Sequence, residues 1–146
     1  MRRILLAAVV LAVLVVIVGR AQTPATIAVV RDPDCSCCEK WVAHLERAGF
    51  KATLTESAGR LKDTQKIPGT ARSCHTGTIA GYLIEGHVPA DDIKRLLKER
   101  PAIVGLAVPG MPTGSPGMES TSGKITPYDV LSVDKDGRTS VFASHR

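Results

Sequence analysis

TIAVVRDPDCSCCEKWVAHLERAGFKATLT, residues 26–55, is the stretch that decides the fold. Its first five residues, 26–30, are apolar or β-branched, which is typical of a strand covered on both faces of a sheet. Residues 52–55 predict a second strand, and the segment between the two has helical periodicity. This β-α-β order favours a parallel strand pair with a right-handed crossover.

The intervening helix is predicted to begin near Ser36, because Ser36 and Glu39 have the spacing of a capping box. Gly49 supplies its C-terminal stop. The apolar positions recur at i, i+3, i+4 and i+7, as expected of a helix with one buried face. These positions are Cys38, Trp41, Val42 and Leu45.

The rest of the chain extends this order. Residues 57–66 predict a polar helix, and residues 76–80 and 82–85 predict a hairpin. A further helix is predicted to start at Pro89 and to end before Pro101, with acidic residues in its first turn and basic residues in its last. The order β-α-β-α-β-β-α is that of a thioredoxin-like domain.

Two features follow this predicted core. Residues 109–118 are dense in glycine and proline and predict an irregular loop. Residues 128–133 and 138–143 flank a turn sequence and predict a hairpin. The predicted fold class is therefore α/β: a thioredoxin-like domain with an added Gly/Pro-rich loop and a C-terminal β-hairpin.

The chain of 146 residues opens with the pattern of an export signal. A short basic start precedes the apolar run 4–18, and small residues follow at 19 and 21, where a signal peptidase would cleave. We therefore expect a signal peptide at 1–21 and a domain at 22–146. An uncleaved anchor is the alternative, although 15 residues rise only about 22 Å as a helix, less than the hydrocarbon core of about 30 Å. Both interpretations predict a periplasmic or otherwise exported domain, which would touch a membrane only through an uncleaved N-terminal segment.

The net charge of +5 comes largely from this opening segment. Without Arg2, Arg3 and Arg20, 16 basic residues face 14 acidic ones. No basic run interleaved with aromatic residues is present, so we expect no nucleic-acid partner. A domain of this size can also fold without disulfides as staples, so the four cysteines call for another explanation.

Cys35, Cys37 and Cys38 lie where the first strand runs into the helix. Exposed backbone N–H groups and the positive end of the helix dipole stabilise thiolates there, and the thiolate is both nucleophile and metal ligand. Cys74 precedes the strand predicted at 76–80. A thioredoxin-like path would bring Cys74 beside the other three cysteines.

Three interpretations of these sulfurs stay open. The first is a soft-metal site, with copper(I) favoured and zinc or silver as alternatives. The second is a thiol–disulfide oxidoreductase using the C-x-x-C pair Cys35 and Cys38. The third is structural disulfides, paired as Cys35–Cys38 with Cys37–Cys74 or as Cys35–Cys37 with Cys38–Cys74. The residues alone do not decide whether the chain turns over a substrate.

Further candidate ligands lie outside the cysteines. His75 adjoins Cys74, and Met111 and Met118 offer thioethers from the Gly/Pro-rich loop, although each methionine could equally pack that loop down. His87 could face the site or solvent. His44 lies about 10 Å along the helix from Cys37 and is expected to be a surface or packing residue.

Several motifs together resemble one known family. They are CSCCEKWVAHL at 35–45, SCHT at 73–76, GYLIEGHVP at 81–89, GLAVPGM at 105–111 and GSPGM at 114–118. The chain resembles a small exported metal-binding family, catalogued as a domain of unknown function, that includes the copper-resistance protein CopG. The likeness runs from about Thr26 to Met118.

This resemblance implies a thioredoxin-like fold, a periplasmic setting and a role in copper or silver handling. It implies that Cys35, Cys37, Cys38 and Cys74 gather around copper, with a multi-copper cluster as one form of the site. It also implies a copper-oxidoreductase role that interconverts Cu(I) and Cu(II). The partners it implies are metal ions and copper-efflux or other periplasmic copper proteins.

Overall fold

The computed structural model describes residues 24–33, 35–56 and 67–146. The predicted signal segment at 1–21 and the predicted helix at 57–66 lie outside these residues. No helix of the described part is long and apolar enough to cross a membrane.

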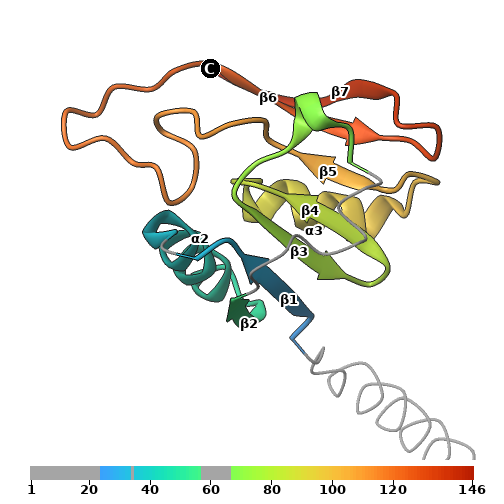
Figure 1. Cartoon of the computed structure of the whole chain (residues 1–146), viewed down its shortest axis with the longest axis horizontal. Coiled ribbons are helices and arrows are strands. Elements are labelled where there is room, and N and C mark those ends of the chain that lie inside the picture. The colour runs from blue at the N-terminus through green and yellow to red at the C-terminus, as the bar shows by residue number, and fades with distance from the viewer. Residues whose placement is uncertain (1–23, 34, 57–66) are drawn as a thin grey trace, which may run out of the picture.

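Seven strands form one mixed sheet in the order β2-β1-β3-β4-β5-β6-β7 (Figure 1). Two α-helices and one turn of 3-10 helix accompany it in the described residues. The strands are β1 (Thr26–Arg31), β2 (Lys51–Glu56), β3 (His75–Ile79), β4 (Tyr82–Glu85), β5 (Gly105–Ala107), β6 (Tyr128–Val133) and β7 (Thr139–His145). The helices are α2 (Ser36–Arg47), η2 (Gly69–Ala71) and α3 (Ala90–Glu99).

The pairing confirms the predicted α/β class and the predicted parallel pair. β1 pairs parallel with β2 across α2, and β3 pairs antiparallel with both β1 and β4. The C-terminal hairpin is present as β6 and β7. The sequence analysis missed β5, which has three residues and lies between β4 and β6.

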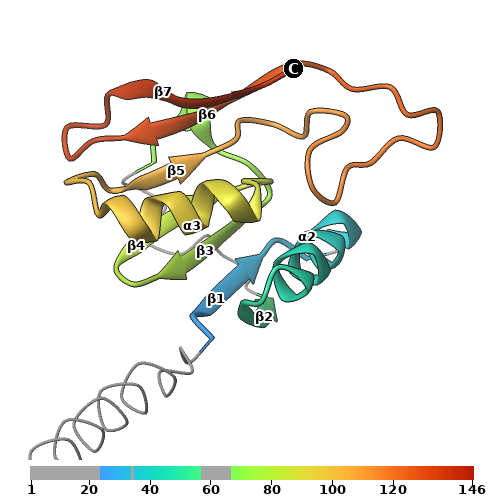
Figure 2. The same cartoon turned by 180° about the vertical axis from the view of Figure 1, so that it is seen from behind.

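Both helices pack on one face of the sheet. Trp41 and Leu45 of α2 and Ile93 and Leu96 of α3 share one core with alternate strand residues such as Ile84. Figure 2 shows α3 crossing in front of β4, with α2 beside β1. On the other face a smaller apolar cluster joins the segment around η2 to the sheet, and it comprises Ile67, Ala71, Leu83, Ala107 and Val133.

Three local predictions are corrected. β1 lies in the interior of the sheet, but it alternates buried Ile27 and Val29 with exposed Ala28, so it is not covered on both faces. Ser36 is the first residue of α2 and Cys35 is its N-cap, with no side-chain cap hydrogen bond, so the predicted capping box is absent. Pro89 is likewise the N-cap of α3 rather than its first helical residue.

The C-terminal hairpin is fastened to α3 by polar and cation–π contacts. The Arg95 guanidinium lies 3.8 Å above the ring of Phe142 and donates to its carbonyl oxygen. Nε2 of His145 lies 2.8 Å from a carboxylate oxygen of Asp92. These contacts make β6 and β7 part of the same domain as the first strands.

His44 proves to be a packing residue that joins the two helices. Its Nε2 accepts a hydrogen bond of 3.1 Å from the backbone N–H of Ala90, the first residue of α3. Pro89 has no side-chain cap of its own, so His44 satisfies an N–H that the helix leaves unpaired. Burial, followed by the nearby charge of Arg47, lowers the pKa of His44 below 6.5 and keeps it an acceptor.

Substituting His44 tests this interhelical cap. His44→Ala should lower the free energy of unfolding by about 1 kcal/mol at pH 7.5, the usual value of a helix cap. His44→Gln, whose amide oxygen can replace Nε2 as acceptor, should remain close to the wild type. Because the folded-state pKa of His44 lies below its unfolded value of 6.5, its stabilising effect is complete above pH 6.5 and is lost as the pH falls. Urea unfolding at pH 7.5 and 5.5 should therefore show a smaller acid-induced loss for His44→Gln than for the wild type.

Candidate metal centre

The junction between β1 and β3 brings the distant cysteine to the other three. Arg31 at the end of β1 pairs with His75 at the start of β3. The next residue after β1, Asp32, lies opposite the residue just before β3, Cys74. The Asp32 backbone N–H donates to the Cys74 carbonyl oxygen at 3.1 Å. Since β1 leads directly into α2, Cys74 lies beside the first turn of that helix.

All four cysteine sulfurs lie within 4.8 Å of one another. The Cys35 Sγ is 3.2 Å from the sulfurs of both Cys37 and Cys74. The Cys74 Sγ is 3.8 Å from that of Cys37 and 3.7 Å from that of Cys38. Strand β1, helix α2 and strand β3 together build this four-sulfur cluster.

One disulfide bond links two members of the cluster. Cys35 and Cys38 form it across the first turn of α2, with a Cα–Cα distance of 5.7 Å. Cys37 and Cys74 are free thiols and half-buried. The Cys35–Cys38 bond belongs to one of the two pairings considered above. The Cys37–Cys74 bond that would complete that pairing is not formed.

Arg31 connects the cluster to β2, a role that the sequence analysis did not identify. One guanidinium nitrogen donates to the Cys35 carbonyl oxygen at 2.8 Å and lies 3.1 Å from the Glu39 carboxylate. The other pairs with Glu56 of β2. With its side chain 13% exposed, Arg31 holds the N-cap residue of α2 against the sheet.

A buried carboxylate bonds to residues on both sides of Cys74, and the sequence analysis missed this residue too. Glu85 of β4 accepts hydrogen bonds of 2.6 Å from the Ser73 backbone N–H and from the Thr76 hydroxyl. The side chain of Glu85 is 1% exposed. A paired buried carboxylate of this kind fixes the path of a short segment, here the one that carries the fourth cysteine.

Cys74 is protonated in this environment. Burial, followed by the charge of Cys37, raises the pKa of the Cys74 thiol to about 11. A cation bound among the sulfurs would reverse this effect, because a metal ion stabilises the thiolate.

Two buried histidines lie close to Cys74. His75 is 2% exposed and His87 is fully buried, and their rings meet edge to face with centroids 5.0 Å apart. Nδ1 of His75 is 3.5 Å from the Cys74 sulfur, and Nε2 of His87 is 3.9 Å from it. Burial, together with the charge of His87, lowers the pKa of His75 to about 3. Burial also lowers the pKa of His87.

The Gly/Pro-rich loop covers the cluster with one of its two methionines. Met111 Sδ is 3.9 Å from the Cys37 sulfur, while its side chain remains 53% exposed. Met118 is half-buried at the end of the loop, where its backbone N–H bonds to the Ser115 carbonyl. The structure therefore brings Met111 to the sulfurs, whereas no contact of Met118 with them is present among the described residues.

Gly117 allows the loop to pack directly on α2. Its φ of +86° is unfavourable for other residues, and a Cβ atom there would lie 2.9 Å from the Trp41 backbone nitrogen and 3.0 Å from the Cys37 carbonyl oxygen. In both Figures 1 and 2 the segment between β5 and β6 descends onto the N-terminal end of α2.

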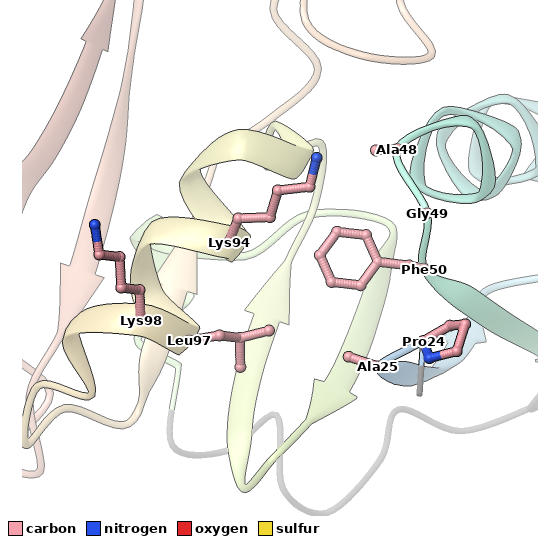
Figure 3. A pocket seen from close by; sticks show the side chains of 8 residues that line it. All are labelled: Pro24, Ala25, Ala48, Gly49, Phe50, Lys94, Leu97 and Lys98. Carbon is pink, nitrogen blue, oxygen red and sulfur yellow. The ribbon is translucent and has the colours of Figure 1, made fainter. Parts of the chain in front are cut away.

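A hollow of about 630 Å³ lies at the other end of α2. Figure 3 shows Phe50 projecting toward α3, with Leu97 and Ala25 nearby and two lysines on α3. Its lining has no cysteine or histidine and comprises Pro24, Ala25, Ala48, Gly49, Phe50, Lys94, Leu97 and Lys98. Roughly 20 Å of helix separates it from the sulfurs, so it is no part of the candidate metal centre.

Comparisons with known proteins agree with this geometry. A family model described as a protein of unknown function, DUF411, matches residues 71–118. The solved structure "Copper resistance protein copG- Form 1" is 45% identical, with a TM-score of 0.78 over 84% of this chain and 98% of that chain. The chain belongs to the CopG family. A second CopG structure, Form 2, is 44% identical, with a TM-score of 0.78 over 85% of this chain and all of the other. No curated protein matches this chain.

Membership confirms the resemblance inferred from the sequence motifs. The residues matched by the family model include Cys74, both buried histidines and the methionine loop. Cys35, Cys37 and Cys38 lie outside that match, although the CopG structures cover most of the chain.

The state of the four thiols can be tested by alkylation and peptide mapping. Without reduction, iodoacetamide should label only Cys37 and Cys74, and after reduction all four cysteines should react. Because the pKa of Cys74 is about 11, its labelling rate should still be rising at pH 10, well above the range of an ordinary thiol. Labelling of Cys35 or Cys38 in metal-free, unreduced protein would contradict the observed disulfide.

Proposed function

We propose that this protein binds copper(I) through Cys35, Cys37, Cys38 and Cys74 and serves copper handling or resistance. The observation that carries the proposal is the convergence of four sulfurs from two distant segments within 4.8 Å. The likeness to solved copper resistance proteins at 45% identity supports copper over other soft metals.

The donor set fits this ion. Thiolates and thioethers are soft ligands that favour Cu(I), and the cluster offers four of the former with Met111 beside it. Metal–sulfur bonds of about 2.3 Å place tetrahedral sulfur ligands about 3.8 Å apart. The separations of 3.7 and 3.8 Å from Cys74 to its neighbours agree with that value. The separations of 3.2 Å from Cys35 belong to the state in which Cys35 is bonded to Cys38.

The disulfide makes metal loading dependent on reduction. While Cys35 and Cys38 are joined, neither can act as a thiolate, so a two-electron reductant must first convert them to two thiols. When bound, copper would supply a Cu(I)/Cu(II) couple, and the protein's sulfurs would set which state is favoured. The proposed role thus includes interconversion of Cu(I) and Cu(II).

A thiol–disulfide oxidoreductase is the second candidate function. It is favoured by the Cys35–Cys38 disulfide at a helix N-terminus. This function would persist after removal of all metal, whereas a copper-handling protein would have no such activity. Disulfide exchange measured on metal-free protein separates the two.

The proposal includes a thioredoxin-like domain in an exported protein. Strand order β2-β1-β3-β4 with β3 antiparallel, together with α2 and α3 on one face, supports the thioredoxin-like assignment. The signal pattern at 1–21 supports a periplasmic domain at 22–146, which would exchange copper with efflux or other periplasmic copper proteins.

Copper retention by cysteine variants tests the proposal. Reduced protein reconstituted anaerobically with Cu(I) should retain copper through desalting, and Cys37→Ser or Cys74→Ser should lose most of it. Ser36→Ala removes an exposed residue between the ligands and should retain wild-type copper, while Met111→Leu should have a small effect. The metal content of each protein is measured by atomic absorption. Failure of the fully reduced wild type to hold copper would overturn the proposed function.

A further inference from the structure

We propose that the hollow between the C-terminal end of α2 and helix α3 binds an amphiphilic anion, meaning one apolar chain or ring that carries a carboxylate or phosphate group. The hollow lies at the end of α2 away from the sulfurs, and its lining includes no cysteine or histidine. This site goes beyond the proposed copper function and does not depend on it.

The hollow has the size and the apolar surface of a small-molecule site. Its volume of about 630 Å³ lies within the range of roughly 300–1,000 Å³ that is usual for ligand pockets. The ring of Phe50 and the side chain of Leu97 face each other across it, with Ala25 beside them (Figure 3). Phe50 is a core residue with 8% of its surface exposed, and Leu97 packs against the same core. An apolar chain between these side chains would therefore be removed from water by contact with apolar surface.

The charged part of the lining is positive. Lys94 and Lys98 are its charged residues, and no acidic residue of the described chain lines the hollow. The two lysines are exposed and stand four residues apart on α3, so their charges repel each other. In Figure 3 both ammonium groups lie away from Leu97 and Ala25, which gives the hollow an apolar part and a cationic part. A ligand that complements both parts has an apolar body and a negative group.

Neither lysine is held in a strong ion pair. The Nζ of Lys94 lies 3.5 Å from a carboxylate oxygen of Asp91, but the two side chains are 50% and 94% exposed, and surface pairs of this kind contribute little. Glu99, the acidic neighbour of Lys98, pairs with Arg95 instead. Lys98 is in no ion pair with any residue that the structure describes. Because a lysine carries its charge on a flexible four-carbon stem, both ammonium groups can turn toward an anion over the hollow.

A smaller hollow adjoins the first and extends its positive charge. It has a volume of about 350 Å³ and shares Ala48 and Lys94 with the larger hollow. Arg47 lines it, and the acidic residue of its lining, Asp91, is the one that already pairs with Lys94. The excess of positive charge along both hollows favours an anionic amphiphile over a neutral or cationic one.

Titration of the full chain with short amphiphiles tests the site. Decanoate, kept below its micellar concentration, should shift the backbone amide NMR resonances around Phe50 and Leu97 and leave those of residues 35–38 unchanged. Octanoate should bind more weakly, by up to roughly fourfold for each CH₂ removed. Decyltrimethylammonium has the same chain and the opposite charge, and it should not bind. Equal binding of the two decyl compounds would overturn the proposal, as would the absence of these shifts with decanoate.

Removal of the two ammonium charges tests the cationic part of the hollow. The double variant Lys94→Gln/Lys98→Gln should bind decanoate roughly tenfold more weakly than the wild type, because it loses the charged partners of the carboxylate. Both lysines are exposed, so the variant should fold and retain copper(I) as the wild type does. Lys135→Gln, in the exposed turn between β6 and β7, is the matched control and should bind decanoate normally. Unchanged affinity of the double variant for decanoate would refute the site.

Vesicles distinguish a free amphiphile from a membrane surface as the source of the anionic group. Binding of the wild type and the double variant is compared on phosphatidylcholine vesicles with and without phosphatidylglycerol. If the double variant weakens binding to the anionic vesicles but not to decanoate, the lysines contact a membrane surface and the proposed site is wrong. Loss of decanoate binding in the double variant supports the site whatever the vesicles show.

Discussion

The antiparallel pairing of β1 with β3 is the constraint on which the metal centre depends. Cys74 follows Cys35 by 39 positions, and no local structure could bring their sulfurs to 3.2 Å. The ladder that pairs Arg31 with His75, extended by the bond from Asp32 to the Cys74 carbonyl, fixes the two segments in register. A slip of one residue would turn Cys74 to the opposite face of the sheet. The metal centre therefore depends on this strand register.

Supports on three sides keep this junction in place. Arg31 holds the start of α2 to the sheet, Glu85 fixes the backbone around Cys74, and Gly117 lets the loop settle on α2. The Glu85 carboxylate is buried and accepts two hydrogen bonds, and a satisfied buried network of this kind is costly to rearrange. Rigid support matters here because ligands must be placed within tenths of an ångström to favour one metal over another.

The sequence predicted the elements better than it predicted their contacts. The strand and helix of 26–47 were foreseen from periodicity, and a strand starting after Cys74 placed that cysteine near the others. The cap of α2 was predicted wrongly because a capping box depends on which residue ends the strand, and here Cys35 occupies that place. Strand β5 escaped prediction because three residues have no measurable period. Tertiary hydrogen bonds were not predicted, because no spacing of residues in the sequence indicates them. They include the bonds made by Arg31, Glu85 and His44.

The disulfide and the four-sulfur cluster compete for the sulfurs of Cys35 and Cys38, whereas the two buried histidines lie near the sulfur of Cys74. Oxidation consumes Cys35 and Cys38 but leaves Cys74, His75 and His87 untouched, since the imidazoles cannot take part in it. Reduction frees two more sulfurs and shifts the donor balance toward soft ligands. The redox state of one C-x-x-C pair therefore determines how many thiolates this end of the domain can offer to a metal ion. Cys74 lies near both the other three sulfurs and the two histidines, and this placement follows from the position of the strand junction.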